Sequence, residues 1–446
     1  MTIVVGAGIA GLITALRLSA RGERVVVVDG ESTIGGLTRP WQIGGITWDR
    51  FYHVVLGSDG KTKELLRDVG LEDRLTFRPV KTSLYAQGHL YPFSSAADFL
   101  KFPVLGMLDK IRLVATIAHA KYAGNDESYE WVGILDYLTR WSGPRTVERI
   151  WRPLLRAKLG EQHAFASAAF IRATIKRLQG ARKGHVGGEE YGYVRGGYAE
   201  VLKALQARLE KQGVEFALGR PVRVVTLQGD YVRVALEGKE LTADRAILTV
   251  PSPVCAAIAP QLTPPERRAL AQDRYFGVVC TSMLVNRRLG DSYVTNVADP
   301  GFPFTGIINM SALVDRSELG GYDLIYVPKY GPADDRSFRL ADDVLIAQSS
   351  RGLAKIFPGF RQSDVVAAAV ARARHVFPFP RIGRVESLPP ARTSLGRLAI
   401  INNGRLRYAT LNVSDTIEVV DEGLEELEAD PAWRAASESC AFAGSR

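Results

Sequence analysis

Residues 1–31, MTIVVGAGIAGLITALRLSARGERVVVVDGE, contain a strand, a glycine-rich turn, a helix and a second strand in that order. Residues 3–5 form a short apolar run, and residues 12–19 continue with apolar side chains at helical intervals. The glycines between them, at the G-x-G-x-x-G spacing, are Gly6, Gly8 and Gly11. Such a turn lets the backbone approach a pyrophosphate, and the N–H groups at the start of the helix attract that anion.

The second strand, residues 25–28, ends at Asp29, eighteen residues after Gly11. A carboxylate at this place accepts a hydrogen bond from a ribose hydroxyl and disfavours a 2′-phosphate. The ordered set of strand, turn, helix, strand and acid therefore predicts a Rossmann-like dinucleotide-binding domain. By itself it does not decide between a nicotinamide and a flavin.

The residues after Asp29 favour the larger cofactor. Gly35 and Gly36 predict a second tight turn, and residues 41–48 form a hairpin-like pair around Gly44-Gly45. A further loop and hairpin suit a cofactor whose ring extends beyond the phosphates. For this stretch alone, a surface hairpin with no role in binding is the alternative.

Three distant segments complete the pattern. Residues 191–225 contain a glycine turn, an amphipathic helix and strands, and residues 243–251 form a strand that ends in Thr-Val-Pro. Near the C-terminus, Ser414 or Asp415 is a candidate N-cap of another helix. The amides at that helix start can face a polar ring edge.

In this order of motifs the chain resembles the flavin-containing amine oxidase superfamily, whose relatives include protoporphyrinogen oxidases, carotenoid-type desaturases and UDP-galactopyranose mutases. The resemblance covers residues 1–56 closely, 190–255 well and 400–425 more loosely. It implies FAD as the cofactor. The residues it implies for FAD binding are Gly6, Gly8, Ala10, Gly11, Asp29, Gly36, Leu37, Thr38, Val222, Thr416 and Ile417.

The resemblance also implies roles for these residues. The glycines would hold the pyrophosphate, Asp29 the adenosine ribose, Val222 the adenine through its backbone, and the Thr416 and Ile417 amides the pyrimidine edge of the flavin. Many members carry an arginine directly after the paired glycines, where this chain has Leu37. Whether Arg39 replaces that arginine stays open.

The resemblance implies an α/β fold: a Rossmann-like, glutathione-reductase-like FAD-binding domain with a discontinuous α+β substrate domain and a helical insert. The predicted boundaries are 1–85, 190–255 and 386–425 for the FAD-binding domain, 86–189 for the insert, 256–385 for the substrate domain and 426–446 for a disordered tail. Within the substrate domain we expect strands at 277–286 and 323–331, and a helix at 363–377.

The insert carries a set of arginines spaced four, three and four residues apart: Arg145, Arg149, Arg152 and Arg156. On one helix they form a basic stripe, which is either a solvated face or a cradle for an anionic group. Pro153 weakens the argument for a continuous helix. Arg172, Lys176 and Arg177 follow nearby and favour an acidic substrate.

A second insert helix, residues 105–120, has one apolar side, opposed by Lys110 and Arg112. That side is formed by Leu108, Ile111, Val114, Ala115 and Ala118. Most such helices face a protein core, and a minority lie on a membrane surface.

His53 is the single candidate catalytic residue. The resemblance places it beside the flavin, where an imidazole can donate a hydrogen bond or handle a proton, and a structural histidine is the alternative. Phe51 and Tyr52 would wall the ring or touch substrate. His185, in a glycine-rich segment, is expected to be exposed.

The amino-acid composition limits the classes of molecule that this protein is expected to bind. The 446 residues are 46% hydrophobic with a net charge of +9, which favours acidic small molecules or an anionic membrane surface. No aromatic–basic pattern indicates nucleic acid, and no metal-ligand spacing occurs, so neither partner is expected. Cys255, Cys280 and Cys440 show no redox spacing and fit a cytoplasmic protein, with the inner face of the membrane as an alternative place.

These observations predict a FAD-dependent oxidoreductase, amine oxidase- or desaturase-like, that oxidises a C–N or C–C bond of a small molecule by hydride transfer to flavin N5. One alternative is a redox-neutral mutase acting on a nucleotide sugar, and another is a non-catalytic flavin-binding protein. The substrate, the electron acceptor and the oligomeric state stay open.

Overall fold

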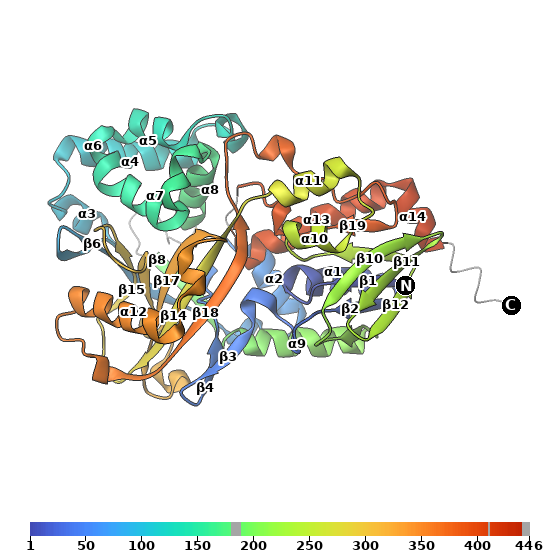
Figure 1. Cartoon of the computed structure of the whole chain (residues 1–446). Helices are drawn as coiled ribbons and strands as arrows, with labels where there is room; N and C mark the ends of the chain where they lie inside the picture. The colour runs from blue at the N-terminus through green and yellow to red at the C-terminus, as the bar shows by residue number, and fades with distance from the viewer. Residues whose placement is uncertain (180–188, 409–410, 439–446) are drawn as a thin grey trace.

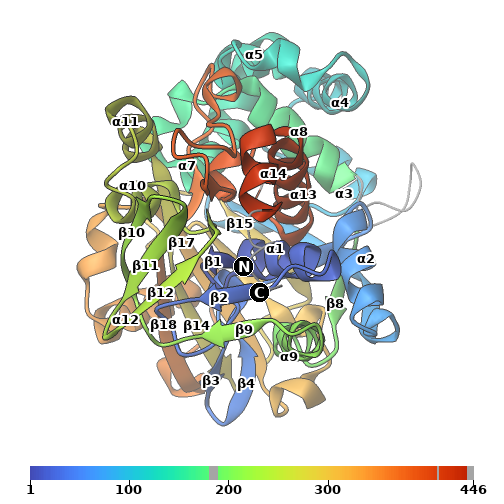
Figure 2. The same cartoon turned by 90° about the vertical axis from the view of Figure 1, so that its right-hand side faces the viewer.

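The computed structural model describes residues 1–179, 189–408 and 411–438. Figure 1 shows two sheets side by side, with a layer of helices above the larger one. The smaller sheet and its helices contain the N-terminus and the last described helix, and Figure 2 shows this half from its own side.

The smaller sheet is parallel, in the order β19-β13-β1-β2-β9. Its strands are β1 (Thr2–Val5), β2 (Val25–Val28), β9 (Glu215–Ala217), β13 (Arg245–Leu248) and β19 (Leu398–Ile400). Every residue of β1, β2 and β13 is buried, because both faces of this sheet are covered. This burial explains the uninterrupted apolar runs in the sequence.

Two layers cover the parallel sheet. On one face lie α1 (Ile9–Ala20), α9 (Tyr198–Lys211) and α13 (Val413–Ala429), which share one core. On the other lie α10 (Ser252–Ile258) and a small antiparallel sheet of β10 (Val222–Gln228), β11 (Tyr231–Leu236) and β12 (Lys239–Ala243). The arrangement is the predicted Rossmann-like, glutathione-reductase-like architecture, in three layers.

The larger sheet has nine strands, in the order β18-β14-β17-β16-β15-β6-β8-β5, with β7 paired to β6. The strands are β5 (Val55–Leu56), β6 (Leu75–Ala86), β7 (His89–Pro92), β8 (Glu189–Val194), β14 (Tyr275–Val285), β15 (Ser292–Val297), β16 (Gly306–Asn309), β17 (Asp323–Pro332) and β18 (Val365–Pro378). A two-stranded ribbon, β3 (Pro40–Ile43) and β4 (Ile46–Asp49), is the predicted hairpin.

The insert is helical, as expected. Its helices are α3 (Ala96–Lys101), α4 (Met107–Tyr122), α5 (Ile134–Ser142), α6 (Pro144–Thr146), α7 (Arg152–Leu159) and α8 (Ala168–Gln179). They enclose a core of their own, which also receives Phe276 and Phe377 from the larger sheet. The remaining helices are α2 (Gly60–Asp68), α11 (Pro264–Gln272), α12 (Asp342–Ile356) and α14 (Pro431–Glu438).

Residues 363–377 do not form the predicted helix. They lie in β18, which pairs along its length with β14. Several alanines in this segment favour a helix locally, but the pairing with fully buried β14 overrides that propensity.

Two predicted boundaries also differ. Strands β5, β6 and β8 fall inside the predicted FAD-binding segments but pair within the larger sheet. The disordered tail is wrong for residues 426–438, which form the end of α13 and α14. Trp433 in α14 is 4% exposed in the core shared by α1 and α13, so this segment carries an apolar anchor. Cys440 and His185 lie outside the described residues.

Candidate functional site

The first glycine turn is closed by backbone contacts that leave no room for side chains. Gly6 has φ +111°, and a Cβ at Gly6 would lie 2.7 Å from Thr249 Oγ1. A Cβ at Gly11 would lie 1.8 Å from the Gly6 carbonyl oxygen. Only glycine fits these two positions, so the helix begins directly against the end of β1.

A second close approach joins this turn to the paired glycines. Gly8 and Gly35 form a parallel bridge, and the Gly35 N–H donates to the Ala7 carbonyl at 2.7 Å. A Cβ on Gly36 would come within 3.0 Å of the Gly8 Cα. A Cβ on Gly8 would have nothing nearer than that Gly36 Cα, at 3.9 Å. The bare backbone here fits the pyrophosphate of a dinucleotide.

Asp29 braces the same turn. One carboxylate oxygen accepts from the Ala7 N–H at 2.6 Å, and the other accepts from the Glu31 N–H at 2.8 Å. A carboxylate has further acceptor sites, so Asp29 can still receive a ribose hydroxyl. The predicted ribose role therefore fits the geometry.

Arginines lie close to this carboxylate region. Arg39 donates to Glu31 at 2.5 Å and is therefore already paired. Arg50, which the sequence did not single out, is next to both, and its buried Nε has no hydrogen-bond partner among the described residues. Burial, and then the charge of Arg39, lowers the pKa of Arg50. Arg50 is thus a second candidate for an anionic part of the cofactor.

The remaining predicted FAD residues are in the expected elements. Ala10 lies in the first turn of α1, Thr38 is buried beside the Gly35 carbonyl, and Val222 begins β10. Thr416 and Ile417 lie in α13, and Ile417 is buried.

The start of α13 differs from the prediction. Its N-cap is Asn412, whose side chain accepts from the Asp415 N–H, and not Ser414 or Asp415. The Thr416 N–H donates to the Asn412 carbonyl at 3.1 Å, so this amide is used within the helix. The first two helical amides, which have no acceptor within α13, belong to residues 413 and 414. Contact of Thr416 and Ile417 with FAD stays a prediction.

His53 lies against α9 and β4. Its ring is 4.9 Å from the Tyr198 ring, and its Nδ1 is 3.7 Å from an Asp49 carboxylate oxygen. The Nδ1 is buried and makes no hydrogen bond with the described residues. This surrounding is compatible with either a structural or a catalytic histidine, and the catalytic role stays a prediction.

Next to His53 in sequence, Tyr52 points into an aromatic cluster that the sequence did not reveal. The Tyr52 and Tyr330 hydroxyls are 2.6 Å apart. Burial raises the pKa of Tyr52 well above its ordinary value, so its hydroxyl stays protonated. The Lys158 ammonium nitrogen lies 3.9 Å from the Tyr330 ring centroid and 4.9 Å from that of Phe377.

This Tyr52–Tyr330–Lys158 cluster lies between the helical insert and the larger sheet. Tyr330 packs against the insert core and the core of the larger sheet. Leu37, the residue after the paired glycines, packs against that same sheet core together with Tyr52. Leu411, just before α13, packs against both the insert core and the core shared by α1, α9 and α13. Two predicted cofactor segments therefore pack against the same cores as members of the cluster.

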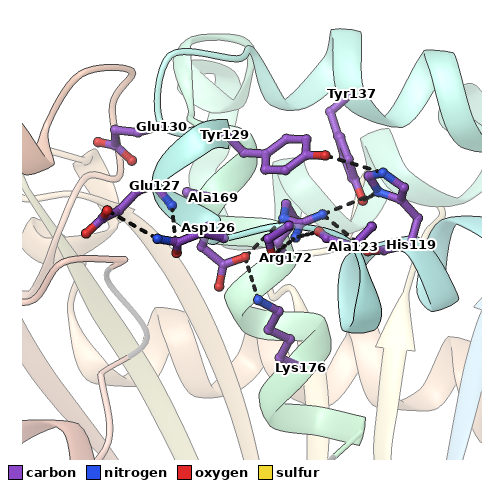
Figure 3. A network of polar contacts seen from close by, with 12 residues as sticks. His119, Ala123, Asp126, Glu127, Tyr129, Glu130, Tyr137, Ala169, Arg172 and Lys176 are labelled. Atoms are coloured by element: carbon purple, nitrogen blue, oxygen red, sulfur yellow. Dashed lines mark hydrogen bonds and ion pairs between the residues drawn. The ribbon is translucent and has the colours of Figure 1, made fainter.

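The insert cations Arg172, Lys176 and Arg177 have partners within the protein. Figure 3 shows Arg172 between Asp126, Tyr129 and His119, with Lys176 on the same carboxylate. Arg177 pairs with Asp59. These three cations are therefore used inside the protein, which removes them as support for an acidic substrate.

The predicted arginine stripe is broken up. A π-helical turn, Val147–Trp151, precedes α7 and places Pro153 near the helix start, where its missing N–H is tolerated. The contacts of the four arginines are Arg145 with Asp109, Arg149 with the Val104 carbonyl, Arg152 with Glu148, and Arg156 with Glu161. The solvated-face interpretation is favoured over the anion cradle.

A cavity of about 710 Å³ lies elsewhere, between α11 and residues 379–389. Arg381, Arg384 and Asp273 line it, and it contains none of the predicted FAD residues. Arg384 already donates to the carbonyls of Gly404 and Leu406.

The family model for flavin containing amine oxidoreductases matches residues 9–408. The chain belongs to this family. Membership confirms the flavin cofactor, FAD, that the glycine turn and its surroundings predict. It also agrees with the predicted class of oxidoreductases.

Individual relatives are distant. A zeta-carotene-forming phytoene desaturase of Myxococcus xanthus is 24% identical over 283 residues, which cover 55% of this chain and 52% of the desaturase. The chain spans about half or less of the curated relatives it matches. A putrescine oxidase structure has a TM-score of 0.71 and covers 96% of this chain and 99% of its own. A reduced UDP-galactopyranose mutase has a TM-score of 0.70, with 98% of each chain covered. Both structures are 16% identical to this chain and show the fold alone.

Two features are absent from the described part of the chain. Across residues 1–179, 189–408 and 411–438, no helix is long and apolar enough to cross a membrane. In the same part of the chain, no group of three or more His, Cys, Asp or Glu side chains could hold a metal ion.

Proposed function

We propose that this protein is a FAD-dependent oxidoreductase that removes a hydride from a C–N or C–C bond of a small molecule held at the Tyr52–Tyr330–Lys158 cluster. The observation that carries the proposal is the position of Lys158. Its ammonium lies over two aromatic faces, and it has no carboxylate partner among the described residues. An N–H donor of Lys158 that is not directed at these rings can therefore be donated to a ligand.

The residues of the cluster would make different kinds of contact with a bound substrate. The half-buried Tyr330 ring offers apolar contact, and Lys158 can donate to a carboxylate or carbonyl oxygen. The Tyr52–Tyr330 pair needs only one hydroxyl proton for its own hydrogen bond, so the other proton can be donated to substrate. When bound, FAD supplies the hydride acceptor.

The mutase alternative has less support from these contacts. A mutase of nucleotide sugars needs arginines that converge on a diphosphate, whereas each arginine of the stripe has its own partner. An aromatic wall with a single ammonium suits a smaller, partly apolar substrate better.

The test uses purified FAD-loaded protein under anaerobic conditions, mixed with fractions of a small-molecule extract of the source cells. We expect one fraction to bleach the visible flavin band. A band that bleaches only with dithionite, after which an isomer of unchanged mass is formed, would replace the oxidoreductase with a mutase. Failure to bind FAD would overturn both.

Variants then locate the substrate. Lys158→Met should slow flavin reduction at limiting substrate by about tenfold or more, because a charge-assisted hydrogen bond is lost. Lys203→Met, on the exposed side of α9, is the matched control and should leave the rate unchanged. Equal rates for Lys158→Met and wild type would remove the cluster from the proposed site.

A further inference from the structure

Helix α4 presents its apolar side to solvent. The predicted apolar residues Leu108, Ile111 and Val114 are 68%, 60% and 55% exposed. Lys110, predicted on the polar side, is buried and donates to the Leu100 carbonyl. The core expectation for this face is therefore wrong: Leu113, Thr116 and Ala120 pack inward instead.

The exposed residues form one continuous surface, which we name the α4 stripe. At 100° per residue, all its α4 members fall within one side of the helix, opposite the buried residues. Leu100 of α3, whose carbonyl accepts from Lys110 of α4, is also exposed and is counted with the stripe. The stripe consists of Leu100, Met107, Leu108, Ile111, Val114 and Tyr122. Figures 1 and 2 place α4 at the outer surface of the insert, away from the parallel sheet.

Cations flank the stripe. Arg112 and Lys121 are exposed at its two edges, and Lys101 is exposed next to Leu100. The single carboxylate on α4, Asp109, lies 3.5 Å from Arg145, so its charge is balanced. An apolar face with basic edges complements an apolar layer beneath anionic headgroups.

The dimensions also fit a bilayer surface. A 16-residue helix is about 24 Å long, shorter than the about 30 Å hydrocarbon core, so α4 suits a position in the membrane plane. As a protein interface, a strip about 10 Å wide would cover far less than the roughly 800 Å² per partner of a stable complex.

We infer that the α4 stripe docks this protein on the surface of an anionic lipid bilayer. The inference uses only the insert surface and stands whether or not the proposed reaction is correct. Met107, Leu108, Ile111 and Val114 enter the boundary between headgroups and acyl chains, while Arg112 and Lys121 contact lipid phosphates.

The test is co-sedimentation of the full-length, FAD-loaded protein with vesicles of phosphatidylcholine and phosphatidylglycerol in equal parts. We expect binding that weakens in high salt and on pure phosphatidylcholine, because exposed charges are screened. Leu108→Glu/Val114→Glu should weaken binding by at least about tenfold, because two buried apolar side chains are lost. Leu178→Glu/Val344→Glu changes the same residue types at exposed positions of α8 and α12 and should bind as wild type.

Light scattering and flavin absorbance accompany the assay. Unchanged flavin absorbance would show that the variant is folded, and Lys121→Gln, a milder change, should also reduce binding to the anionic vesicles. Absence of binding by wild type would overturn the inference. So would a dimer in solution that Leu108→Glu/Val114→Glu converts to monomer, because the stripe would then be an interface between copies.

Discussion

Arg172 and Lys158 are cations of the same helical insert with opposite surroundings. Arg172 is 0% exposed; it donates to Asp126 and to the carbonyls of Ala123 and Gly124, and its guanidinium lies 3.9 Å from the Tyr129 ring centroid. Lys158 contacts aromatic faces and no anion among the described residues. A buried cation with every donor used stabilises the fold, whereas one held by rings alone keeps its donors for a ligand.

The difference also explains why sequence position misleads. Arg172, Lys176 and Arg177 are close along the chain, and for that reason the sequence favours an acidic substrate. Their partners, Asp126 and Asp59, come from other segments, and sequence gives no measure of that distance. Nothing in the sequence marks Lys158 as a functional residue, because its aromatic partners lie on β17 and β18.

The largest effect is expected for Arg172→Met. It leaves the Ala123 and Gly124 carbonyls without their donor and Asp126 with Lys176 as its remaining cation, which should cost about 3–5 kcal/mol of unfolding free energy. Urea unfolding followed by circular dichroism measures the loss. Arg156→Met, which removes an exposed pair with Glu161, is the control and should change stability by less than about 1 kcal/mol. Equal losses in both variants would show that the Arg172 network is not a structural centre.

Tyr330→Phe tests the aromatic support of Lys158. The Phe ring keeps the contact with the ammonium, but the buried Tyr52 hydroxyl loses its partner at 2.6 Å. We expect a loss of about 1–3 kcal/mol in the same unfolding measurement. Tyr231→Phe, at an exposed hydroxyl bonded to Gln228, should be nearly neutral. A neutral Tyr330→Phe would mean that the hydroxyl pair does not organise the cluster.

The half of the molecule that contains the parallel sheet could be predicted in detail from the sequence. There, the function of each residue is local: Gly6, Gly8 and Gly11 lie within one turn, and Asp29 follows the next strand. The larger sheet could not be predicted as well, because its pairings are distant. The sequence predicts a helix where β18 lies, since only the pairing with β14 makes these alanines and valines a strand.

At the candidate site, residue types alone do not predict which side chains contact one another, because those contacts depend on the fold. His53 was singled out for its chemistry, yet its neighbour Tyr52 makes the contact that reaches Tyr330. The predicted N-cap of α13 is two or three residues late, because Ser, Asp and Asn all suit an N-cap and only the fold selects Asn412.

Lys158→Met should affect stability least among these three substitutions. Met fills a similar volume, and the lost cation–π contacts contribute about 0.5–2 kcal/mol, with Lys203→Met as the surface control. A small stability change together with the slower flavin reduction expected above would show that Lys158, unlike Arg172, acts in substrate binding and not in stabilising the fold. A loss as large as that of Arg172→Met would make Lys158 a structural residue and remove the main support for its role in substrate binding.

The smallest expected effect is a pH dependence carried by His119. Its ring stacks on Trp141 and contacts the Tyr129 and Tyr137 hydroxyls. Burial, and then the charges of Arg172 and Arg140, lowers the pKa of His119 below its ordinary value. The folded protein therefore binds this proton less readily than the unfolded chain does.

The sign of the pH effect follows from that difference. The stability that neutral His119 contributes is complete above about pH 6.5, the ordinary histidine pKa, and decreases as the pH falls below it. Unfolding free energies at about pH 8 and about pH 5.5 should show a smaller decrease for His119→Gln than for wild type. His89→Gln, at an exposed ring bonded to the Gln87 carbonyl, should keep the wild-type slope. If the decrease in unfolding free energy between about pH 8 and about pH 5.5 were the same in His119→Gln and wild type, the Arg172 network would tolerate a charged imidazole. The guanidinium of Arg172 would then be free to move away from His119.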